Sequence, residues 1–249
     1  DETPIVDWVT AGLPEAERRG LGGLKREPGP DQAGKTAEKA FDTSIMEIAD
    51  DIAFGVHDLE DAIALELVGR QALEAEIGEL LEGEWAKARG LGGVLDRLFP
   101  RNAEGEDASA WRKQGIGSLV HAFLASVEVA EAAAFDTPLL RYRARLQPEA
   151  EALLDALKGF VGREVIQAPA VQTLEYRGQQ IVMRLFAALA SDPGRLLKTG
   201  FARRWREAES EPAGLRVVCD YIAGMTDEYA SRMYERLFMP RQGTVFERL

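Results

Sequence analysis

The feature that most constrains this fold is the spacing of apolar residues, which recurs at intervals of three and four along most of the chain. The clearest segment follows Asp42 and carries these apolar residues: Ile45, Ile48, Ala49, Ile52, Val56, Leu59 and Ile63. At about 100° per residue they cover an arc of roughly 100° on one face of an α-helix, the width of a core-facing stripe. The spacing predicts a helix over residues 42–69 with this face buried. No alternation with a period of two runs long enough to require a sheet, so we expect an all-α fold.

Polar residues at the start of this segment predict where the helix begins. Asp42, Thr43 and Ser44 are all good N-cap residues, and Glu47 follows Ser44 by three positions, as in a capping box. The same reasoning predicts further helices over residues 70–88, 111–135, 148–160, 170–190 and 212–238. Residues 11–37, which are rich in glycine, proline and charge, indicate a loop instead. We therefore expect a loop-rich segment over residues 1–41 and a helical region over residues 42–249.

The composition excludes several classes of protein. Of the 249 residues, 46% are hydrophobic and 29% are charged, as in ordinary globular proteins. The apolar stretch over residues 181–190 is interrupted by Arg184 and is too short to span a bilayer, so we expect no membrane partner. The first residues lack the features of a signal peptide. The single cysteine, Cys219, excludes an internal disulfide and suits the cytoplasm, and its apolar neighbours predict a buried side chain.

The face opposite the apolar stripe carries an unusual set of residues. Asp50, Phe54 and Asp58 follow one another at intervals of four, so they line one side of the predicted helix over roughly 12 Å. A solvated face explains the carboxylates, but it explains the aromatic ring between them less well, so Phe54 indicates a second contact surface. A carboxylate can hold a divalent cation, a ring can stack on a sugar or base, and a second carboxylate can accept hydrogen bonds from hydroxyls. These residue types suit the wall of a nucleotide pocket.

Two stretches carry a resemblance to a known family. SIMEIADDIAFGVHDLEDAI, residues 44–63, resembles the last metal-binding motif of the deoxynucleoside-triphosphate triphosphohydrolases, the dGTPase-like branch of the HD-domain superfamily. RVVCDYIAGMTDEYASRMYERLF, residues 216–238, resembles the C-terminal signature of the same family. The two motifs keep the family's order, and the resemblance covers the chain from about residue 42 onward. It implies a multi-helix HD-domain-like bundle, of which this chain holds mostly the C-terminal part.

The resemblance implies a role for each residue of the polar face. Asp50 matches the aspartate that completes the family's metal site, Phe54 matches an aromatic, commonly tyrosine, beside the deoxyribose, and Asp58 matches the acid that binds the sugar 3′-hydroxyl. Phenylalanine has no phenolic hydroxyl, so the hydrogen-bonding part of that role is not carried over. A divalent metal (Mg²⁺, Mn²⁺ or similar) is the implied cofactor. Tyr176 and Arg177 lie in a segment similar to one near the family's substrate pocket, which implies that they contact nucleotide.

The sequence departs from the family at the other metal ligands. No histidine precedes Ile52, and the two in the chain are His57 and His121, so the family's upstream His, His and Asp ligands are absent from these residues. The His57–Asp58 pair is not the pair that names the superfamily, because that pair lies upstream. Neighbouring residues on a helix also point about 100° apart, which does not favour joint ligation.

Two functional interpretations follow. The leading one is part of a metal-dependent enzyme that cleaves a dNTP, such as dGTP, to deoxynucleoside and inorganic triphosphate. In that case residues 1–41 continue from an N-terminal region with the HD motif, which also carries the catalytic residues. The alternative is a non-catalytic helical module that senses nucleotides or assembles subunits and has lost the metal site.

Weaker signals concern partners. The net charge of −12 argues against nonspecific polyanion binding by the whole surface. Residues 198–206, KTGFARRWR, mix bases and aromatics as single-strand binders do, although a solvated or subunit-contact face is the simpler interpretation. Arg141, Arg143 and Arg145 suggest a phosphate patch or, more simply, an exposed basic turn, and His121 is expected in a core or interface. The expected partners are a dNTP, further copies of the chain, and a single-stranded nucleic acid or regulatory nucleotide.

Overall fold

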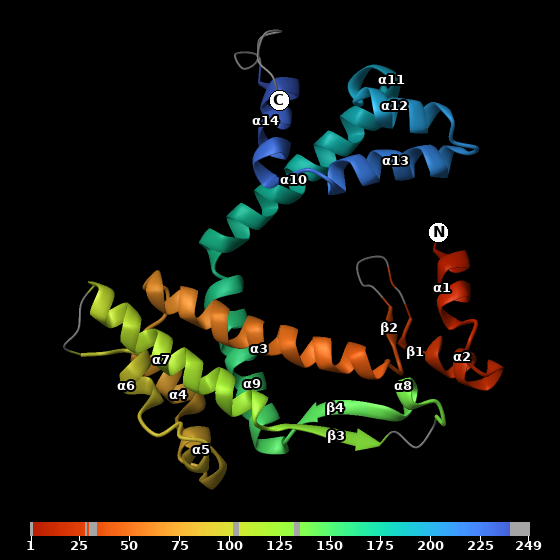
Figure 1. The fold of residues 1–249 in the computed structure, drawn as a ribbon. Helices are drawn as coiled ribbons and strands as arrows, with labels where there is room; N and C mark the ends of the chain where they lie inside the picture. Colours follow the sequence, from red (N-terminus) through yellow and green to blue (C-terminus); the bar gives the residue numbers. More distant parts are fainter. Residues whose placement is uncertain (1, 28, 30–33, 102–104, 132–134, 240–249) are drawn as a thin grey trace. The chain divides into compact units, whose positions relative to one another are not determined.

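The all-α expectation is confirmed by a computed structural model that describes residues 2–27, 29, 34–101, 105–131 and 135–239. Helices make up most of the described chain, and the two β-hairpins are small (Figure 1). The chain divides into two compact units, Asp1–Ile166 and Gln167–Leu249. Among the described helices, none has both the length and the apolar character needed to cross a bilayer.

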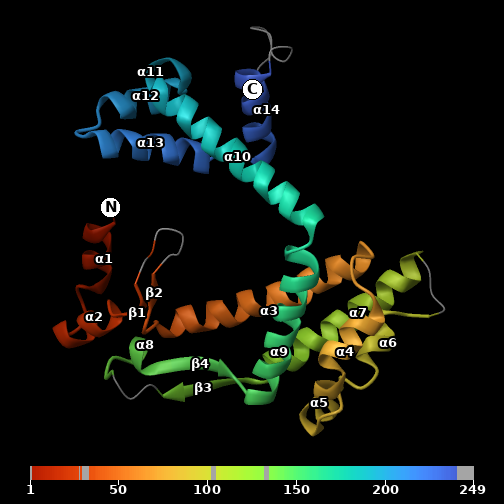
Figure 2. The same ribbon diagram turned by 180° about the vertical axis from the view of Figure 1, so that it is seen from behind.

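The first unit is organised around one long helix, α3, which packs against α7, α9 and strand β4 (Figure 2). Its elements in chain order are α1 (Thr3–Thr10), α2 (Glu15–Leu21), β1 (Leu24–Arg26), β2 (Lys35–Thr36), α3 (Phe41–Ala64), α4 (Arg70–Leu81), α5 (Glu84–Ala88), α6 (Val94–Leu98), α7 (Gly105–Leu124), β3 (Val127–Glu131), α8 (Pro138–Arg141), β4 (Tyr142–Leu146), α9 (Pro148–Val161) and a π-helix, η1 (Gly162–Ile166). The helix expected over residues 70–88 is therefore two helices, α4 and α5.

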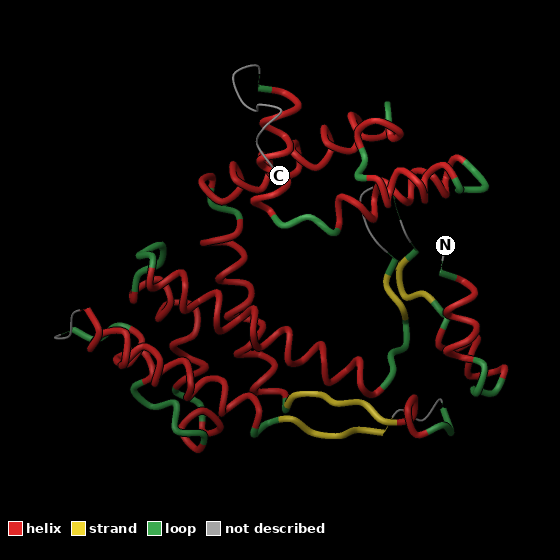
Figure 3. Tube along the Cα trace, turned by 45° about the horizontal axis from the view of Figure 1, so that its top comes forward, coloured by secondary structure: helices red, strands yellow, loops and turns green. Residues whose placement is uncertain are grey.

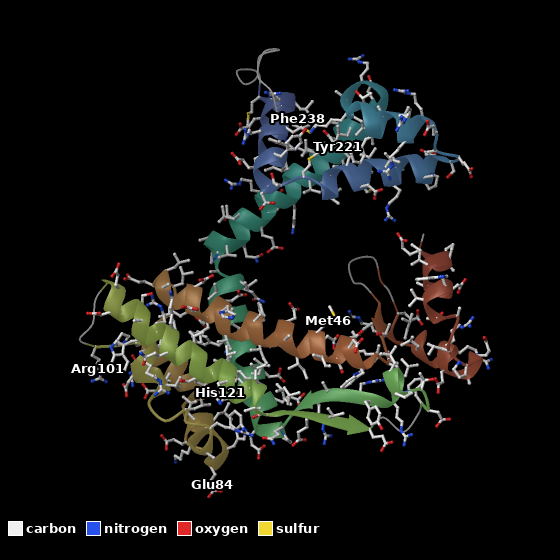
Figure 4. All side chains as sticks on the ribbon, viewed as in Figure 1. Met46, Glu84, Arg101, His121, Tyr221 and Phe238 are labelled. Atoms are coloured by element: carbon white, nitrogen blue, oxygen red, sulfur yellow. The ribbon has the colours of Figure 1, made fainter. Side chains whose placement is uncertain are left out.

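The predicted apolar stripe of α3 is buried over most of its length. Ile52, Val56, Leu59 and Ile63 lie in the core of the first unit, and Ile48 packs against it while half-buried. The prediction is wrong for Ile45, which is 46% exposed, and for Ala49, which is exposed as well. Near its N-terminus α3 is covered by β4 on the side of Ser44, about 100° around the helix from Ile45. The neighbouring Met46 is exposed as well (Figure 4).

The start of α3 also differs from the expected cap. The helix begins at Phe41 after Ala40, so Ser44 lies inside the helix and forms no capping box. Its buried hydroxyl donates to the carbonyl oxygen of Phe41 (2.6 Å) and accepts a hydrogen bond from the backbone N–H of Ala144 in β4 (2.9 Å). Ser44 therefore joins α3 to β4.

Replacing Ser44 with alanine is expected to lower the free energy of unfolding by about 1–3 kcal/mol, because the buried N–H of Ala144 loses its acceptor. Urea unfolding followed by circular dichroism measures the change. Ser118→Ala is the matched control, since its hydroxyl bonds Gln114 on an exposed turn of α7. Equal effects of the two substitutions would contradict the role of Ser44.

The helix predicted over residues 111–135 ends early and gives way to a strand. α7 ends at Leu124, and β3 pairs antiparallel with β4 in the register Val127↔Leu146 and Val129↔Ala144 (Figure 3). Each strand has five residues, too short for its alternation to be recognised beside the helical pattern. The prediction of helix beyond Leu124 is therefore wrong for residues 127–131, which form a strand.

The first forty residues contain more structure than expected. The stretch 11–37, predicted to be a loop, contains α2 and the antiparallel pair β1–β2. Glu17 in α2 is buried, and its Oε1 accepts hydrogen bonds from the backbone N–H groups of Asp136 (2.7 Å) and Thr137 (3.1 Å). The side chain of Thr137 and these N–H groups lower the pKa of Glu17, although burial opposes them. The carboxylate thus fastens α2 to the start of α8.

The second unit is a small helical cluster of α10 (Pro169–Ser191), α11 (Pro193–Leu196), α12 (Thr199–Arg206), α13 (Glu211–Ala223) and α14 (Asp227–Phe238). Its core includes Leu185, Leu189, Val218 and Tyr221. The helix expected over residues 212–238 is interrupted, because Thr226 caps α14 by accepting a hydrogen bond from the N–H of Tyr229 (3.2 Å). Cys219, expected to be buried, is exposed.

Candidate functional site

Helix α3 holds the three candidate residues of the polar face in one row. Asp50, Phe54 and Asp58 each follow the last by about one turn, as the sequence pattern predicts. Asp50 is exposed, and its carboxylate has no hydrogen bond or ion pair with any residue that the structure describes. A charged group in this state is available to bind a cation.

The neighbouring Asp51 has the opposite environment. Its Oδ2 lies 2.9 Å from Nζ of Lys158 in α9, which also lies 3.4 Å from Oδ1 of Asp155. Burial would lower the pKa of Lys158, but the hydrogen bonds and charges of the two aspartates outweigh it and raise the pKa. Asp51 therefore forms an ion pair that joins α3 to α9, whereas Asp50 forms none with the described residues.

A glycine allows this close approach of α3 and α9. A Cβ atom on Gly55 would lie 2.9 Å from Cδ1 of Leu154 and 3.2 Å from Cγ of Lys158. Real Cβ atoms do not approach this closely, so any larger residue here would force the side chains of Leu154 and Lys158 to move. Together with the Asp51–Lys158 ion pair, this packing defines which side of α3 turns toward α9 and leaves Asp50 on another side.

Phe54 and Asp58 are both half-buried. The ring of Phe54 packs against the core of the first unit, so core packing accounts for part of its surface, and the second contact surface expected from the sequence stays a prediction. Burial raises the pKa of Asp58, the negative charge of Asp61 raises it further, and His57 opposes both. His57 is largely exposed, with its Nδ1 3.8 Å from Oε2 of Glu60.

The donor atoms around Asp50 do not by themselves make a metal site. Among the described residues, no group of three or more histidine, cysteine, aspartate or glutamate side chains lies close enough together to hold a metal ion. A carboxylate is the ligand type that Mg²⁺ and Mn²⁺ prefer, but one such ligand does not bind them firmly. Asp50 matches the expected donor type, and the rest of the donor set is not present in the described part of the chain.

The other two candidate substrate contacts lie in the second unit. Tyr176 and Arg177 are neighbours on α10, and Tyr176 is 64% exposed. Arg177 lines a pocket between α10 and α14. Both side chains are accessible, and their contact with nucleotide stays a prediction.

Several weaker sequence signals have a structural explanation. His121, expected in a core or interface, is exposed on α7 and so lies outside the core of this chain (Figure 4). The three arginines of residues 141–145 lie in or next to strand β4 and not in a basic turn, and each has a carboxylate partner: Arg141 pairs with Glu131, Arg143 with Glu38 (2.7 Å) and Arg145 with Glu128 (3.6 Å). This pairing argues against a free phosphate patch.

The basic-aromatic cluster of α12 is divided between two environments. Phe201 and Trp205 pack against the core of the second unit, and the ring centroid of Phe201 lies 4.9 Å from that of Tyr221. Arg203 and Arg206 are exposed. The rings are therefore not presented as a stacking platform for bases, which single-strand binders require.

Sequence reasoning missed a pocket of about 340 Å³ formed by α3, β4 and α9. Its charged lining includes Lys39, Glu47, Asp51, Arg143 and Glu151. The lysine pairs with Glu47 and the arginine with Glu38, so these cations are already neutralised. No local motif identifies the pocket, because its walls come from three segments that are distant in the sequence.

Comparison with known proteins extends the resemblance seen in the motifs. Residues 144–236 match the family described as phosphohydrolase-associated domain. A deoxyguanosinetriphosphate triphosphohydrolase-like protein of Shewanella loihica is 41% identical over 252 residues, which cover 99% of this chain and 55% of that protein. A similarly named protein of Vibrio cholerae is 44% identical over 238 residues, 94% of this chain and 52% of that protein. The chain therefore spans about half the length of these curated relatives.

Proposed function

Because this chain is similar over nearly its whole length to deoxyguanosinetriphosphate triphosphohydrolase-like proteins, we propose that it forms part of an enzyme that hydrolyses dNTPs. Within a protein of the relatives' full length, the reaction would convert a dNTP such as dGTP to the deoxynucleoside and inorganic triphosphate. The catalytic residues would lie outside these 249 residues, and this chain would contribute to holding the cofactor and the substrate.

The observation that carries this proposal is the unpaired carboxylate of Asp50 on the outer side of α3. This carboxylate stands in one row with Phe54 and Asp58, inside a motif that resembles the family's last metal-binding motif, and no described residue pairs with it. The adjacent Asp51 differs from Asp50, because its carboxylate forms an ion pair with Lys158 of α9. Of the two aspartates, Asp50 is therefore the one that remains free to bind a metal ion.

Each residue of the row would then have a separate task. Asp50 would supply one carboxylate ligand to a divalent metal (Mg²⁺, Mn²⁺ or similar), with the other ligands outside the described residues. Phe54 would present the exposed part of its side chain to the deoxyribose, and Asp58 would accept a hydrogen bond from a sugar hydroxyl. The raised pKa of Asp58 follows from its burial, so contact with a sugar hydroxyl would compensate for the water that it has lost.

Partners and location remain further proposals. A dNTP is the partner that the family favours, with Tyr176 and Arg177 as additional contacts. Assembly into homo-oligomers, a regulatory nucleotide and a cytoplasmic location stay predictions from the sequence. A single-stranded nucleic acid has less support, because Phe201 and Trp205 face the core of the second unit.

The product of the reaction tests the proposal. A protein of the relatives' full length is incubated with each dNTP and Mg²⁺ or Mn²⁺, and the products are separated by ion-exchange chromatography. Equal amounts of deoxynucleoside and inorganic triphosphate are expected, with none formed in excess EDTA. Release of orthophosphate and a dNDP would show a different reaction. Nucleotide binding without turnover under all these conditions would favour the non-catalytic module.

A further inference from the structure

We infer that the groove between α10 and α14 in the second unit is a binding site for a small organic molecule that carries an oxyanion, either a phosphate or a carboxylate. The groove has a volume of about 470 Å³, within the range of small-molecule sites. The inference depends on the geometry of the groove and does not require hydrolysis, although Arg177 is also one of the nucleotide contacts proposed above.

The groove is formed by two helix faces with the same spacing. On α10 the lining residues are Arg177, Gln180 and Ile181, and on α14 they are Ser231, Tyr234 and Glu235. In each set the second and third residues follow the first by three and four positions, so all three lie on one side of their helix. The two helices pack against each other, which brings these two faces together.

The apolar part of the groove is held in place by its neighbours. Ile181 and Tyr234 are half-buried and pack against the core of the second unit. The hydroxyl of Tyr234 accepts a hydrogen bond from Arg184 (3.0 Å), and its ring centroid lies 4.8 Å from that of Phe238. A wall that is already ordered loses little conformational entropy when a ligand binds.

The polar groups of the groove are unused. In the described part of the chain, the side chains of Arg177, Gln180, Ser231 and Glu235 have no hydrogen-bond or ion-pair partner. Arg177 and Glu235 in particular are not within 4 Å of each other, although both line the groove. Both side chains are exposed, so pairing them would contribute little, and both stay available to a ligand in the groove.

The chemistry of these groups defines the ligand class. A free guanidinium binds phosphate or carboxylate through two parallel hydrogen bonds. The carboxylate of Glu235, with the amide of Gln180 and the hydroxyl of Ser231, suits hydroxyl or amino groups on the same molecule. Ile181 and Tyr234 offer contact to a flat apolar part. The ligand that fits is therefore a small organic oxyanion with an apolar body. Inorganic phosphate would bind Arg177 but would leave Ile181 and Tyr234 without a contact.

Phenyl phosphate is the probe that tests this inference on the 249-residue chain. The methyl groups of isoleucine and methionine are labelled with ¹³C, so that Ile181 and Met239, which also lines the groove, report binding by NMR. Phenyl phosphate is expected to shift both signals in a saturable way, while inorganic phosphate and phenol bind more weakly. Benzoate, tested in the same manner, distinguishes a carboxylate site from a phosphate site, and binding of either supports the inference.

Two arginine variants provide the decisive comparison. Arg177→Gln is expected to weaken phenyl phosphate binding by about tenfold or more, because a charge-assisted hydrogen bond is lost. Arg203→Gln removes an equally exposed arginine from α12 and should leave the affinity unchanged. The methyl spectra of both variants report whether the fold is retained. Equal affinity of the Arg177→Gln variant and the wild type, or no shift of the Ile181 and Met239 signals at millimolar probe, would overturn the inference.

Discussion

Replacing Asp50 with alanine, in a protein of the relatives' full length, is expected to reduce the release of inorganic triphosphate by more than about 100-fold and to lower the content of bound divalent metal. Loss of a residue that merely supports a metal ligand typically costs 10–100-fold, so loss of a ligand itself should exceed that range. The basis for this expectation is the unpaired carboxylate of Asp50 on α3, within the motif that resembles the family's metal site.

Two neighbouring substitutions separate metal binding from surface charge. Asp51→Ala removes the same charge one residue later but only breaks an ion pair with Lys158, so a loss of stability of about 1 kcal/mol or less and near-normal turnover are expected. Asp58→Ala should keep the metal and raise KM for the deoxynucleotide, because an acceptor for a sugar hydroxyl is lost.

The measurements for this series are metal per subunit, by atomic emission, and triphosphate release at several substrate concentrations. Retention of both by the Asp50→Ala variant would remove α3 from the catalytic site. It would leave the similarity to the dGTPase-like proteins intact, because that similarity extends over nearly the whole chain.

Replacing Ile52 with alanine is expected to lower the free energy of unfolding by about 2–5 kcal/mol. Ile52 is 4% exposed and lies in the core of the first unit, so alanine would leave a cavity that rigid neighbours fill only in part. This cost is a large fraction of the stability of a typical domain.

Ile45→Ala is the matched control for this substitution. Ile45 is the same residue type, two helical turns earlier on the same predicted stripe, but it is 46% exposed and should lose only about 1 kcal/mol or less. Urea unfolding of the isolated chain, followed by the circular dichroism of the helices, measures both. Similar losses at the two positions would show that the N-terminal part of the stripe is covered in solution.

The pair Ile45 and Ile52 also shows how far the sequence could predict the fold. A period of 3.6 residues is a local property, so it identified α3 and the buried face of its middle and C-terminal parts. Which part of that face is covered depends on where α7, α9 and β4 end, and this is not encoded in the helix itself. The same limit applies to Ser44, which is a good cap residue by type. Its hydroxyl does not cap the helix but accepts a hydrogen bond from the backbone N–H of Ala144, one hundred positions away.

The β3–β4 hairpin illustrates the same limit for strands. Val127 and Leu146 face each other only because the chain turns back between them, and neither five-residue strand has a pattern strong enough to be recognised alone. The three arginines of residues 141–145 show the same limit, because their carboxylate partners could not be identified from the local sequence. Two of their carboxylate partners come from β3 and one precedes α3, so an apparent basic patch is neutralised by residues that are distant in sequence.

The sequence by itself determined the helical class, the row of Asp50, Phe54 and Asp58 on one side of α3, and the resemblance to the dGTPase-like family, because helical period and motif are properties of consecutive residues. Only the tertiary structure decided that Asp51 is held by Lys158 while Asp50 has no partner, that Phe54 rests partly on the core, and that a groove with an unpaired arginine lies between α10 and α14. Each of these depends on which distant side chains approach. The physical reason is that ion pairs, burial and cavities belong to contacts between elements, whose partners no local pattern specifies.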